Sequence, residues 1–402
     1  RNLDILDDAL EEIRETAGID SDIDNVDLDD ANTYELLAAG NSIGVFQLES
    51  SPMRALMRSL AADNFEDVAA LVALYRPGPM AANMHNDYAD RKNGRKPVEY
   101  IHPDAEEILG DTYGLMIYQE SVMRMAQKFA GYSLAEADSL RKAMGKKIRE
   151  AMEKERAKFV DGVEANGYDR ELGVEMFDII AQFADYAFNK SHSYGYGFVA
   201  YQIAYLKAHY PVQYLSALLT SVKSNLDKAA IYLNECRVMG IEVVVPDINR
   251  ARMDFHPDPN LDGDTATADT IVFGLSAVRN VGEGLVELLL AERDENGPFP
   301  DFYEFCERVD TQVLNKRTVE ALIKAGAFDS LGHARQGLLA VFEQIIDQTV
   351  ARRRERDMGV MTLFGDADGG DDIFNERIAI PDTEFDKSRR LAYEKEMLGL
   401  YI

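Results

Sequence analysis

Apolar residues recur every three or four positions along the first half of the chain, which is the spacing of amphipathic helices. This period predicts helices at 3–15, 33–39, 52–61, 65–74, 119–129, 134–143, 149–166, 172–186, 196–209 and 211–224. Asp63 with Glu66 and Ser133 with Glu136 have the spacing of capping boxes, which predicts the starts of two of these helices. The first half is therefore expected to be almost entirely helical.

The pattern changes near residue 241. Residues 241–246 and 270–273 are short runs rich in β-branched residues, and a Gly/Asp-rich turn at 260–264 separates them. Helical periodicity resumes at Leu275 and continues to about Arg352, before a Gly/Asp-rich linker. The fold expected is mainly α, with a multi-helical domain, a small α/β connector and a second helical region.

Length and composition narrow the class of protein. A chain of 402 residues with 46% apolar composition can form two to four domains. No window approaches the roughly 18 apolar residues of a membrane span, and residues 1–30 are too acidic for a signal peptide, so a cytoplasmic location is expected. Cys236 and Cys306 have no partner at ligand spacing and are expected in the core. The start at Arg1 and the apolar end suggest a fragment.

The charge distribution is uneven. The formal net charge of −28 argues against nucleic-acid binding when it is taken as one number. Residues 1–40 hold 13 acidic residues against 2 arginines, whereas residues 141–158 hold 8 basic residues against 3 acidic ones. The basic stretch predicts a local surface for phosphate, and the alternative is a solvated helix face with pairs such as Glu150 and Lys154.

Two segments place cations beside turn residues. Arg76 directly precedes Pro-Gly-Pro, which fixes extended backbone and could hold the guanidinium towards a phosphate or carboxylate. In the second segment, Arg141 and Lys142 precede Gly145, which is suited to end a helix, and Lys146 and Lys147 follow it. These four cations predict a phosphate clamp. The alternatives are a helix stop with a surface arginine and a basic helix end.

The segment Asn189-Lys-Ser-His-Ser193 opens a predicted helix that carries several tyrosines. Ser or Asn at a helix start exposes N–H groups to an anion, Lys190 could bind a phosphate, and His192 a phosphate or a base edge. The alternative is an aromatic core helix in which His192 is buried. No Asp or Ser stands at triad spacing from His192, so nucleophilic catalysis is not expected.

Residues 274–287 have the pattern of a helix-hairpin-helix unit. Gly282 and Gly284 would bring backbone N–H groups at the start of the second helix against a DNA phosphate. Residues 314–328 supply a second helix that ends in a glycine turn, as paired hairpins require. The alternative is a helical linker with glycine C-caps. The sequence has no Walker loop, paired-carboxylate motif or metal-ligand cluster, so two-metal phosphoryl transfer cannot be assembled from it.

Six blocks in order resemble the fingers of C-family bacterial DNA polymerases, the family of DNA polymerase III alpha subunits. They are Gly44-Val-Phe-Gln-Leu-Glu-Ser50, Ala73-Leu-Tyr-Arg-Pro-Gly-Pro-Met80, Tyr113-Gly-Leu-Met-Ile-Tyr-Gln-Glu120, Leu140-Arg-Lys-Ala-Met-Gly-Lys-Lys147, Phe188-Asn-Lys-Ser-His192 and Leu206-Lys-Ala-His-Tyr-Pro211. The resemblance continues through the Gly282-Glu-Gly284 hairpin to the C-terminus.

The resemblance implies template-directed addition of deoxynucleotides to a DNA primer. Mg²⁺ would be held by palm carboxylates upstream of Arg1, so the fragment is expected to be inactive alone. The implied triphosphate-binding residues are Arg76, Arg141, Lys142, Lys146, Lys147, Lys190, Ser191 and His192. The implied DNA-binding residues are Arg279, Val281, Gly282, Gly284, Lys316 and Arg317. Lys142 stands where many relatives carry arginine, which replaces a planar fork with a point charge.

The implied partners are primer-template DNA, a deoxynucleoside triphosphate, a sliding clamp and other replicative holoenzyme subunits. Gly359-Val-Met-Thr-Leu-Phe-Gly365 ends like a clamp-binding motif, with Leu363 and Phe364 as apolar anchors, but Val360 replaces the expected glutamine. The alternative for this segment is an apolar patch on the domain.

The resemblance also implies an order of segments along the chain. They are the end of the palm at 1–30, fingers at 31–225, a connector with short strands at 226–272, the helix-hairpin-helix region at 273–350, an acidic linker at 351–380 and a C-terminal segment at 381–402. Two other functions stay open, an error-prone translesion paralogue and a non-enzymatic DNA-binding module.

Overall fold

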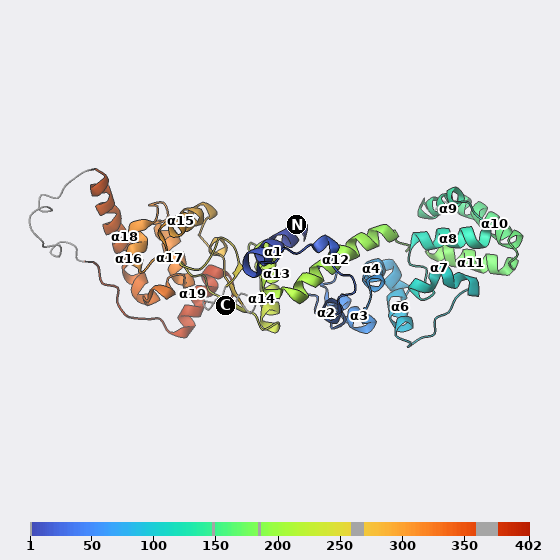
Figure 1. Ribbon diagram of the computed structural model, residues 1–402, viewed down its shortest axis with the longest axis horizontal. Coiled ribbons are helices and arrows are strands. Elements are labelled where there is room, and N and C mark those ends of the chain that lie inside the picture. The colour runs from blue at the N-terminus through green and yellow to red at the C-terminus, as the bar shows by residue number, and fades with distance from the viewer. Residues whose placement is uncertain (1, 147–148, 184–185, 259–268, 359–376) are drawn as a thin grey trace, which may run out of the picture. The chain divides into compact units, whose positions relative to one another are not determined.

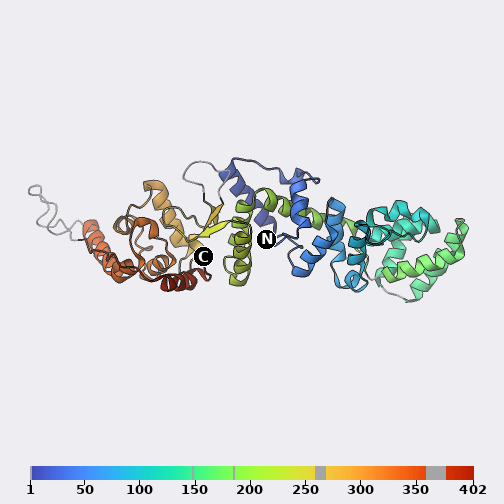
Figure 2. The same ribbon diagram turned by 90° about the horizontal axis from the view of Figure 1, so that it is seen from below.

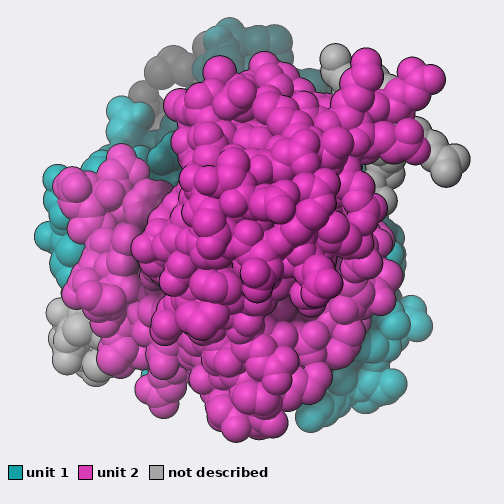
Figure 3. Space-filling model, turned by 90° about the vertical axis from the view of Figure 1, so that its right-hand side faces the viewer, with its two compact units in different colours: residues 1–21, 210–402 teal, residues 22–209 magenta. Residues whose placement is uncertain are grey.

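The computed structural model describes residues 2–146, 149–183, 186–258, 269–358 and 377–402 (Figures 1 and 2). The fold is mainly α, as the periodicity predicts. The chain forms two compact units, one of residues 22–209 and the other of residues 1–21 with 210–402; Figure 3 gives them different colours. No helix in the described ranges combines the length and the apolar character that crossing a membrane requires.

The unit of residues 22–209 contains a first group of helices built around a long central helix. Its members are α2 (Ala31–Ala38), α3 (Ser51–Leu60), α4 (Phe65–Leu74), α5 (Pro77–Ala81), α6 (Met84–Lys92) and α12 (Lys190–His209). Helix α12 packs along α4 and α2. Its buried Ser193 hydroxyl donates to the Ala69 carbonyl at 2.5 Å, and Gly197 allows the backbones to approach, since a Cβ there would lie 3.2 Å from the Ala69 Cα.

A second group in the same unit has its own core. It comprises α7 (Glu106–Leu109), α8 (Gln119–Ala130), α9 (Leu134–Lys146), α10 (Arg149–Ala165) and α11 (Arg170–Phe183). Phe129, Phe159 and Phe177 are buried at the centre of this group. Aromatic side chains of this size remove a large apolar area from water, so these positions stabilise the group.

The other unit begins with α1 (Asn2–Ala17), which packs on α13 (Pro211–Ser221). Helix α14 (Leu226–Val238) follows α13 in the sequence. A small sheet comes next, formed by β1 (Glu242–Val244), β2 (His256–Pro257) and β3 (Thr270–Val272). The strand order is β1-β3-β2; β1 is parallel to β3 with Val243 opposite Ile271, and β2 is antiparallel to β3.

The rest of this unit is helical again. It contains α15 (Glu283–Asn296), α16 (Phe302–Arg308), α17 (Lys316–Ala325), α18 (Arg335–Asp357) and α19 (Lys387–Leu398). Short 3-10 turns complete the two units at η1 (Ile23–Asn25), η2 (Pro103–Ala105), η3 (Gly110–Thr112), η5 (Leu275–Ala277) and η6 (Asp329–Leu331). The guanidinium of Arg335 is buried and donates to Asp329 at 2.8 and 2.6 Å and to Glu394 at 2.9 Å, so this charge is paired within the core.

Most local predictions are confirmed, with three corrections. The Ser133–Glu136 capping box forms in both directions, at 2.8 and 3.3 Å. The expected box at Asp63 is wrong, because Asn64 caps α4 and accepts from the Asp67 N–H at 3.0 Å. Gly145 does not end its helix, since α9 continues to Lys146.

The third correction concerns the extent and number of the elements. Helix α12 begins at Lys190 rather than at residue 196, and α6, α14 and the two-residue strand β2 were not predicted. The Pro-Gly-Pro segment begins helix α5, so the extended backbone expected there is limited to Arg76. Cys236 and Cys306 are both buried, as expected of core residues. The six segments expected along the chain stay a prediction.

Candidate functional site

Residues 117–119 and 186–192 meet beside Arg76 in the unit of residues 22–209. The Phe188 N–H donates to the Ile117 carbonyl at 3.0 Å, and the Gln119 N–H donates to the Phe188 carbonyl at 2.9 Å. These two bonds make a parallel bridge between Tyr118 and Phe188. The bridge places the start of α12 beside the start of α8, although the two lie far apart in the sequence. We call this place the α8–α12 junction.

Arg76 is held rigidly at the α8–α12 junction. Its backbone is extended, with φ −145° and ψ 156°, and its Nε donates to the Ala73 carbonyl at 2.8 Å. Its Nη2 donates to the Tyr186 carbonyl at 2.5 Å, and its Cζ lies 4.4 Å from the ring centroid of Phe188. Burial lowers the pKa of Arg76, but a guanidinium stays protonated in proteins. The arginine therefore contributes a fixed positive charge.

Lys190 is the first residue of α12 and lies between two aromatic rings. Its Nζ is 5.5 Å from the ring centroid of Tyr118 and 5.4 Å from that of Tyr194. Among the described residues, Lys190 forms an ion pair with Asp111, whose Oδ2 lies 3.9 Å from the Nζ. A pair at this distance is loose, and 35% of the lysine side chain is exposed. The ammonium is therefore positioned by rings and available to an anion.

His192 is exposed rather than buried, so the aromatic-core alternative for this residue is wrong. Its ring lies 5.3 Å from that of Phe188 and 4.3 Å from that of Tyr196. Its backbone N–H donates to the Asn189 side-chain oxygen at 2.8 Å. Ser191, its neighbour, is also exposed. Arg76 and His192 thus both contact the ring of Phe188, while Lys190 contacts the ring of Tyr118, the residue that pairs with Phe188.

Glu120 completes this arrangement, and the sequence reasoning missed it. Its Oε2 accepts from the Lys190 N–H at 3.0 Å, and its Oε1 accepts from the Asn189 Nδ2 at 3.1 Å. The N–H groups of Lys190 and His192 are therefore already bonded, which corrects the expectation of free donors along the whole helix start. The signal for Glu120 was its place at the end of the Tyr113–Glu120 block, but spacing gave no contact across so many residues.

Arg141 and Lys142 lie on α9 and share one acidic partner. Arg141 donates to Asp138 Oδ1 at 2.9 and 2.7 Å, and the Lys142 Nζ is 2.7 Å from Asp138 Oδ2. Lys142 and Arg141 together lower the pKa of Asp138. Within the described ranges, no contact joins this pair to Arg76 or Lys190. The side chains of Lys146 and Lys147 lie outside the described residues.

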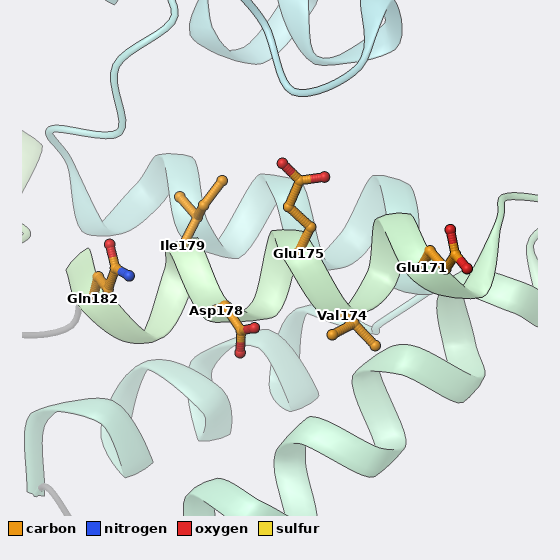
Figure 4. A pocket seen from close by; sticks show the side chains of 6 residues that line it. All are labelled: Glu171, Val174, Glu175, Asp178, Ile179 and Gln182. Carbon is orange, nitrogen blue, oxygen red and sulfur yellow. The ribbon is translucent and has the colours of Figure 1, made fainter.

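A shallow depression of about 450 Å³ follows the outer face of α11 (Figure 4). Its lining is acidic and apolar: Glu171, Val174, Glu175, Asp178, Ile179 and Gln182. Asp178 is paired with Arg156 at 2.9 Å. The acidic lining repels phosphate, and none of the residues expected to bind nucleotide lines this depression.

Residues 274–287 and 314–328 form two glycine-turn units, which pack on each other in the part of the chain formed by residues 1–21 and 210–402. Gly282 is the N-cap of α15, and Asn315 caps α17 by accepting from the N–H groups of Arg317 and Thr318. The Thr318 hydroxyl donates to the Asn280 carbonyl at 3.2 Å, which ties the two helix starts together. The glycine-turn unit of residues 274–287 has only the 3-10 turn η5 where a short helix was expected.

The expected DNA-binding residues differ in exposure. Arg279, Gly282, Gly284 and Arg317 are exposed, whereas Val281 is buried. The Nζ of Lys316 lies 2.9 Å from Asp347 and 3.3 Å from Glu343, so its charge is partly neutralised. The expected clamp anchors Leu363 and Phe364 lie outside the described residues.

Comparison with known proteins shows which family the chain resembles along its length. Residues 2–167 match the model of the bacterial DNA polymerase III alpha subunit finger domain, and residues 240–338 match a helix-hairpin-helix motif. The chain is 50% identical to the DNA polymerase III subunit alpha of Mycobacterium tuberculosis (strain CDC 1551 / Oshkosh), over 100% of this chain and 34% of the relative. The chain belongs to the bacterial DNA polymerase III alpha-subunit family.

Other members of the DNA polymerase III alpha-subunit family are similar over nearly the same span. The subunit of Thermus aquaticus is 42% identical over 100% of this chain and 32% of the relative. That of Pseudomonas aeruginosa (strain PAO1) is 43% identical over 94% of this chain and 33% of the relative. The chain thus spans about one third of the length of these curated relatives.

The finger-domain match includes Arg76, Glu120 and Arg141, while the start of α12 lies beyond it. The helix-hairpin-helix match includes both exposed helix starts. Among the described residues, no group of three or more His, Cys, Asp or Glu side chains could hold a metal ion.

Proposed function

We propose that this chain is the part of a replicative DNA polymerase that holds the triphosphate of the incoming deoxynucleotide and contacts the primer-template duplex. The observation that carries the proposal is the α8–α12 junction. There Arg76 and Lys190 are fixed by carbonyls and aromatic rings, and the Lys190 ammonium makes only a loose pair with Asp111, at 3.9 Å. Family membership supports the same conclusion.

The junction suits a polyanion because its cations are fixed before the ligand arrives. Preorganised charges stabilise the negative charge that develops on the phosphates as pyrophosphate leaves, without reorganising at that moment. Arg76 and Lys190 would supply the positive charge, while Ser191 and His192 would donate hydrogen bonds at the start of α12. Arg141, Lys142, Lys146 and Lys147 would form a second cationic group, with Arg141 and Lys142 first leaving Asp138.

The paired glycine-turn units would bind the duplex backbone. The start of α15 has no side-chain cap, so its N–H groups can donate to phosphate oxygens, and such contacts do not depend on base sequence. At the start of α17, Asn315 already accepts from the N–H groups of Arg317 and Thr318, so α17 would contribute mainly through its side chains. Arg279 and Arg317 are exposed beside these helix starts and would add charge, whereas Lys316 contributes less because two carboxylates hold it. Val281 would act through the core that supports the hairpin.

We extend the proposal to the partners and place of action of the whole polymerase. It would catalyse 5′–3′ nucleotidyl transfer in the bacterial cytoplasm, with Mg²⁺ held by residues outside this chain. Leu363 and Phe364 would anchor a sliding clamp, and other holoenzyme subunits would bind elsewhere. Binding of the chain to an immobilised clamp, compared with the Leu363→Ala/Phe364→Ala variant, tests the clamp contact.

Equilibrium binding tests the nucleotide site directly. A fluorescent deoxynucleoside triphosphate is titrated with the 402-residue chain, with Lys190→Ala and with Arg76→Lys. Each substitution should weaken binding by roughly 10- to 150-fold, because a hydrogen bond to a charged group contributes about 1.5–3 kcal/mol. Arg76→Lys keeps the charge but loses the planar fork that bonds two carbonyls.

The matched control is Arg170→Ala, which removes an exposed arginine paired with Asp161 and Glu164 in the same unit. It should leave the Kd unchanged. If the wild-type chain binds no triphosphate while still binding duplex, the nucleotide site is refuted and the simple DNA-binding module is favoured.

A further inference from the structure

We infer that Glu120 is a positioning residue for the triphosphate site, and that it acts as the acceptor-only anchor of the α12 start. This inference rests on the proposed function, because it concerns how the same site is assembled. The carboxylate is attached to α8, whereas the groups it fixes are the backbone of Lys190 and the side chain of Asn189. Glu120 thus joins two helices that lie far apart in the sequence, because its two partners follow it by 70 and 69 residues.

The hydrogen bonds form a relay with one allowed direction. The Asn189 side-chain oxygen accepts from the His192 N–H at 2.8 Å, so the amide nitrogen of Asn189 must face Glu120. The Lys190 N–H also faces Glu120, at 3.0 Å. Position 120 therefore receives two donors and must offer two acceptors. An ionised carboxylate meets this requirement, since both of its oxygens accept.

Glutamine at this position cannot satisfy the same partners. Its amide carries one acceptor and one donor, so its nitrogen would face either Asn189 or Lys190, both of which are donors there. Turning the Asn189 amide over would remove the clash but would break the bond to the His192 N–H. In either arrangement one donor at the start of α12 loses its partner, and Lys190 and His192 lose their common anchor.

The charge of Glu120 allows two accounts of the Glu120→Gln variant to be distinguished. A carboxylate beside the start of α12 repels a triphosphate, so Coulomb's law alone predicts tighter nucleotide binding after Glu120→Gln. The positioning role predicts the opposite sign, because the cations would no longer be held in place. The two accounts therefore differ in direction and not only in size.

A complementary exchange restores the relay. In the double variant Glu120→Gln/Asn189→Asp, the carboxylate introduced on α12 would accept from the His192 N–H and from the amide nitrogen introduced on α8. The oxygen of that amide would accept from the Lys190 N–H, so every donor again has an acceptor. The total charge equals that of the wild type. The single variant Asn189→Asp instead places two carboxylates face to face.

The experiment measures the Kd of the same fluorescent deoxynucleoside triphosphate for the wild type, both single variants and the double variant. Each single variant should bind roughly fivefold more weakly, as expected when one partly exposed donor loses its acceptor, and the double variant should return to within about twofold of the wild type. Glu164→Gln is the control, because this exposed carboxylate pairs with Arg170 and should leave the Kd unchanged. Circular dichroism checks that each variant is folded.

Three outcomes separate the inference from its premise. Tighter or unchanged binding by Glu120→Gln overturns the positioning role, as does a double variant no better than the single ones. If one single variant does not fold, recovery from the other single variant to the double variant still decides the matter. A wild-type chain that binds no triphosphate refutes the proposed function instead.

Discussion

Glu12 on α1 shows how one buried group can make stability depend on pH. Its Oε2 is buried and has no hydrogen-bond partner in the described part of the chain. Burial raises the pKa of Glu12 from 4.5 to about 7, against the opposing effect of Arg252. The folded state therefore holds this proton more tightly than the unfolded state does. That stabilisation is complete below pH 4.5 and is lost as the pH rises to about 7.

The variant Glu12→Gln stays neutral and avoids this loss. We expect its thermal midpoint to exceed that of the wild type at about pH 8 and to approach it at about pH 5, because the penalty exists only when the carboxylate is charged. Differential scanning calorimetry across this range measures the difference. A constant difference for Glu12→Gln would contradict the prediction.

At the scale of elements, two helical glycines should respond with opposite signs to the same substitution. A Cβ at Gly162 in α10 would overlap the carbonyl oxygen of Ala130. Because this oxygen belongs to the backbone, it can move only if the helix moves with it. Gly195 in α12 has nothing within 4 Å of such a Cβ. We expect Gly162→Ala to lower stability by about 1–3 kcal/mol and Gly195→Ala to raise it by about 0.8–1.0 kcal/mol.

Urea unfolding of both variants measures these changes. Alanine favours the helix at both positions, so helix propensity alone predicts that both substitutions stabilise. Stabilisation by Gly162→Ala would show that α10 can move away from the end of α8. The pair thus separates local propensity from packing between elements.

At the scale of the molecule, the problem is how a chain with a net charge of −28 approaches DNA. The proposed answer is local: exposed Arg279 and Arg317 flank two helix starts that are tied together by Thr318 and Asn280. We expect Arg279→Ala/Arg317→Ala to weaken duplex binding at all sequences and to reduce the log-log salt slope by about 1.8, or about 0.9 for each phosphate contact. Fluorescence anisotropy of a labelled primer-template across a salt series measures this slope.

Arg14→Ala is the control for this experiment, because it removes an exposed arginine from α1 and should leave the slope unchanged. An unchanged slope in the double variant would place the phosphate contacts elsewhere, with the cations of residues 141–158 as the next surface to test. Adding the correct triphosphate then shows whether duplex binding and nucleotide binding are coupled.

Local pattern was sufficient for most of the helices, because their period, caps and breakers act within a few residues, although it did not predict α6 or α14. The Ser133–Glu136 box and the extended backbone at Arg76 are confirmed for this reason. It was less reliable where two local choices competed: Asn64 rather than Asp63 caps α4, and Gly145 is tolerated inside α9. The family could also be recognised from the sequence, because six blocks of residues resemble it in the same order.

Contacts between distant segments could not be derived from spacing. The bridge between Tyr118 and Phe188, the packing of Arg76 on Phe188 and the anchoring of α12 by Glu120 all join segments far apart in the sequence. The pairing of Arg141 and Lys142 with Asp138 is local, yet only the folded helix shows which carboxylate neutralises them. A residue type limits the bonds a side chain can make, but the tertiary structure decides its partners, because those partners are brought near only when the helices pack.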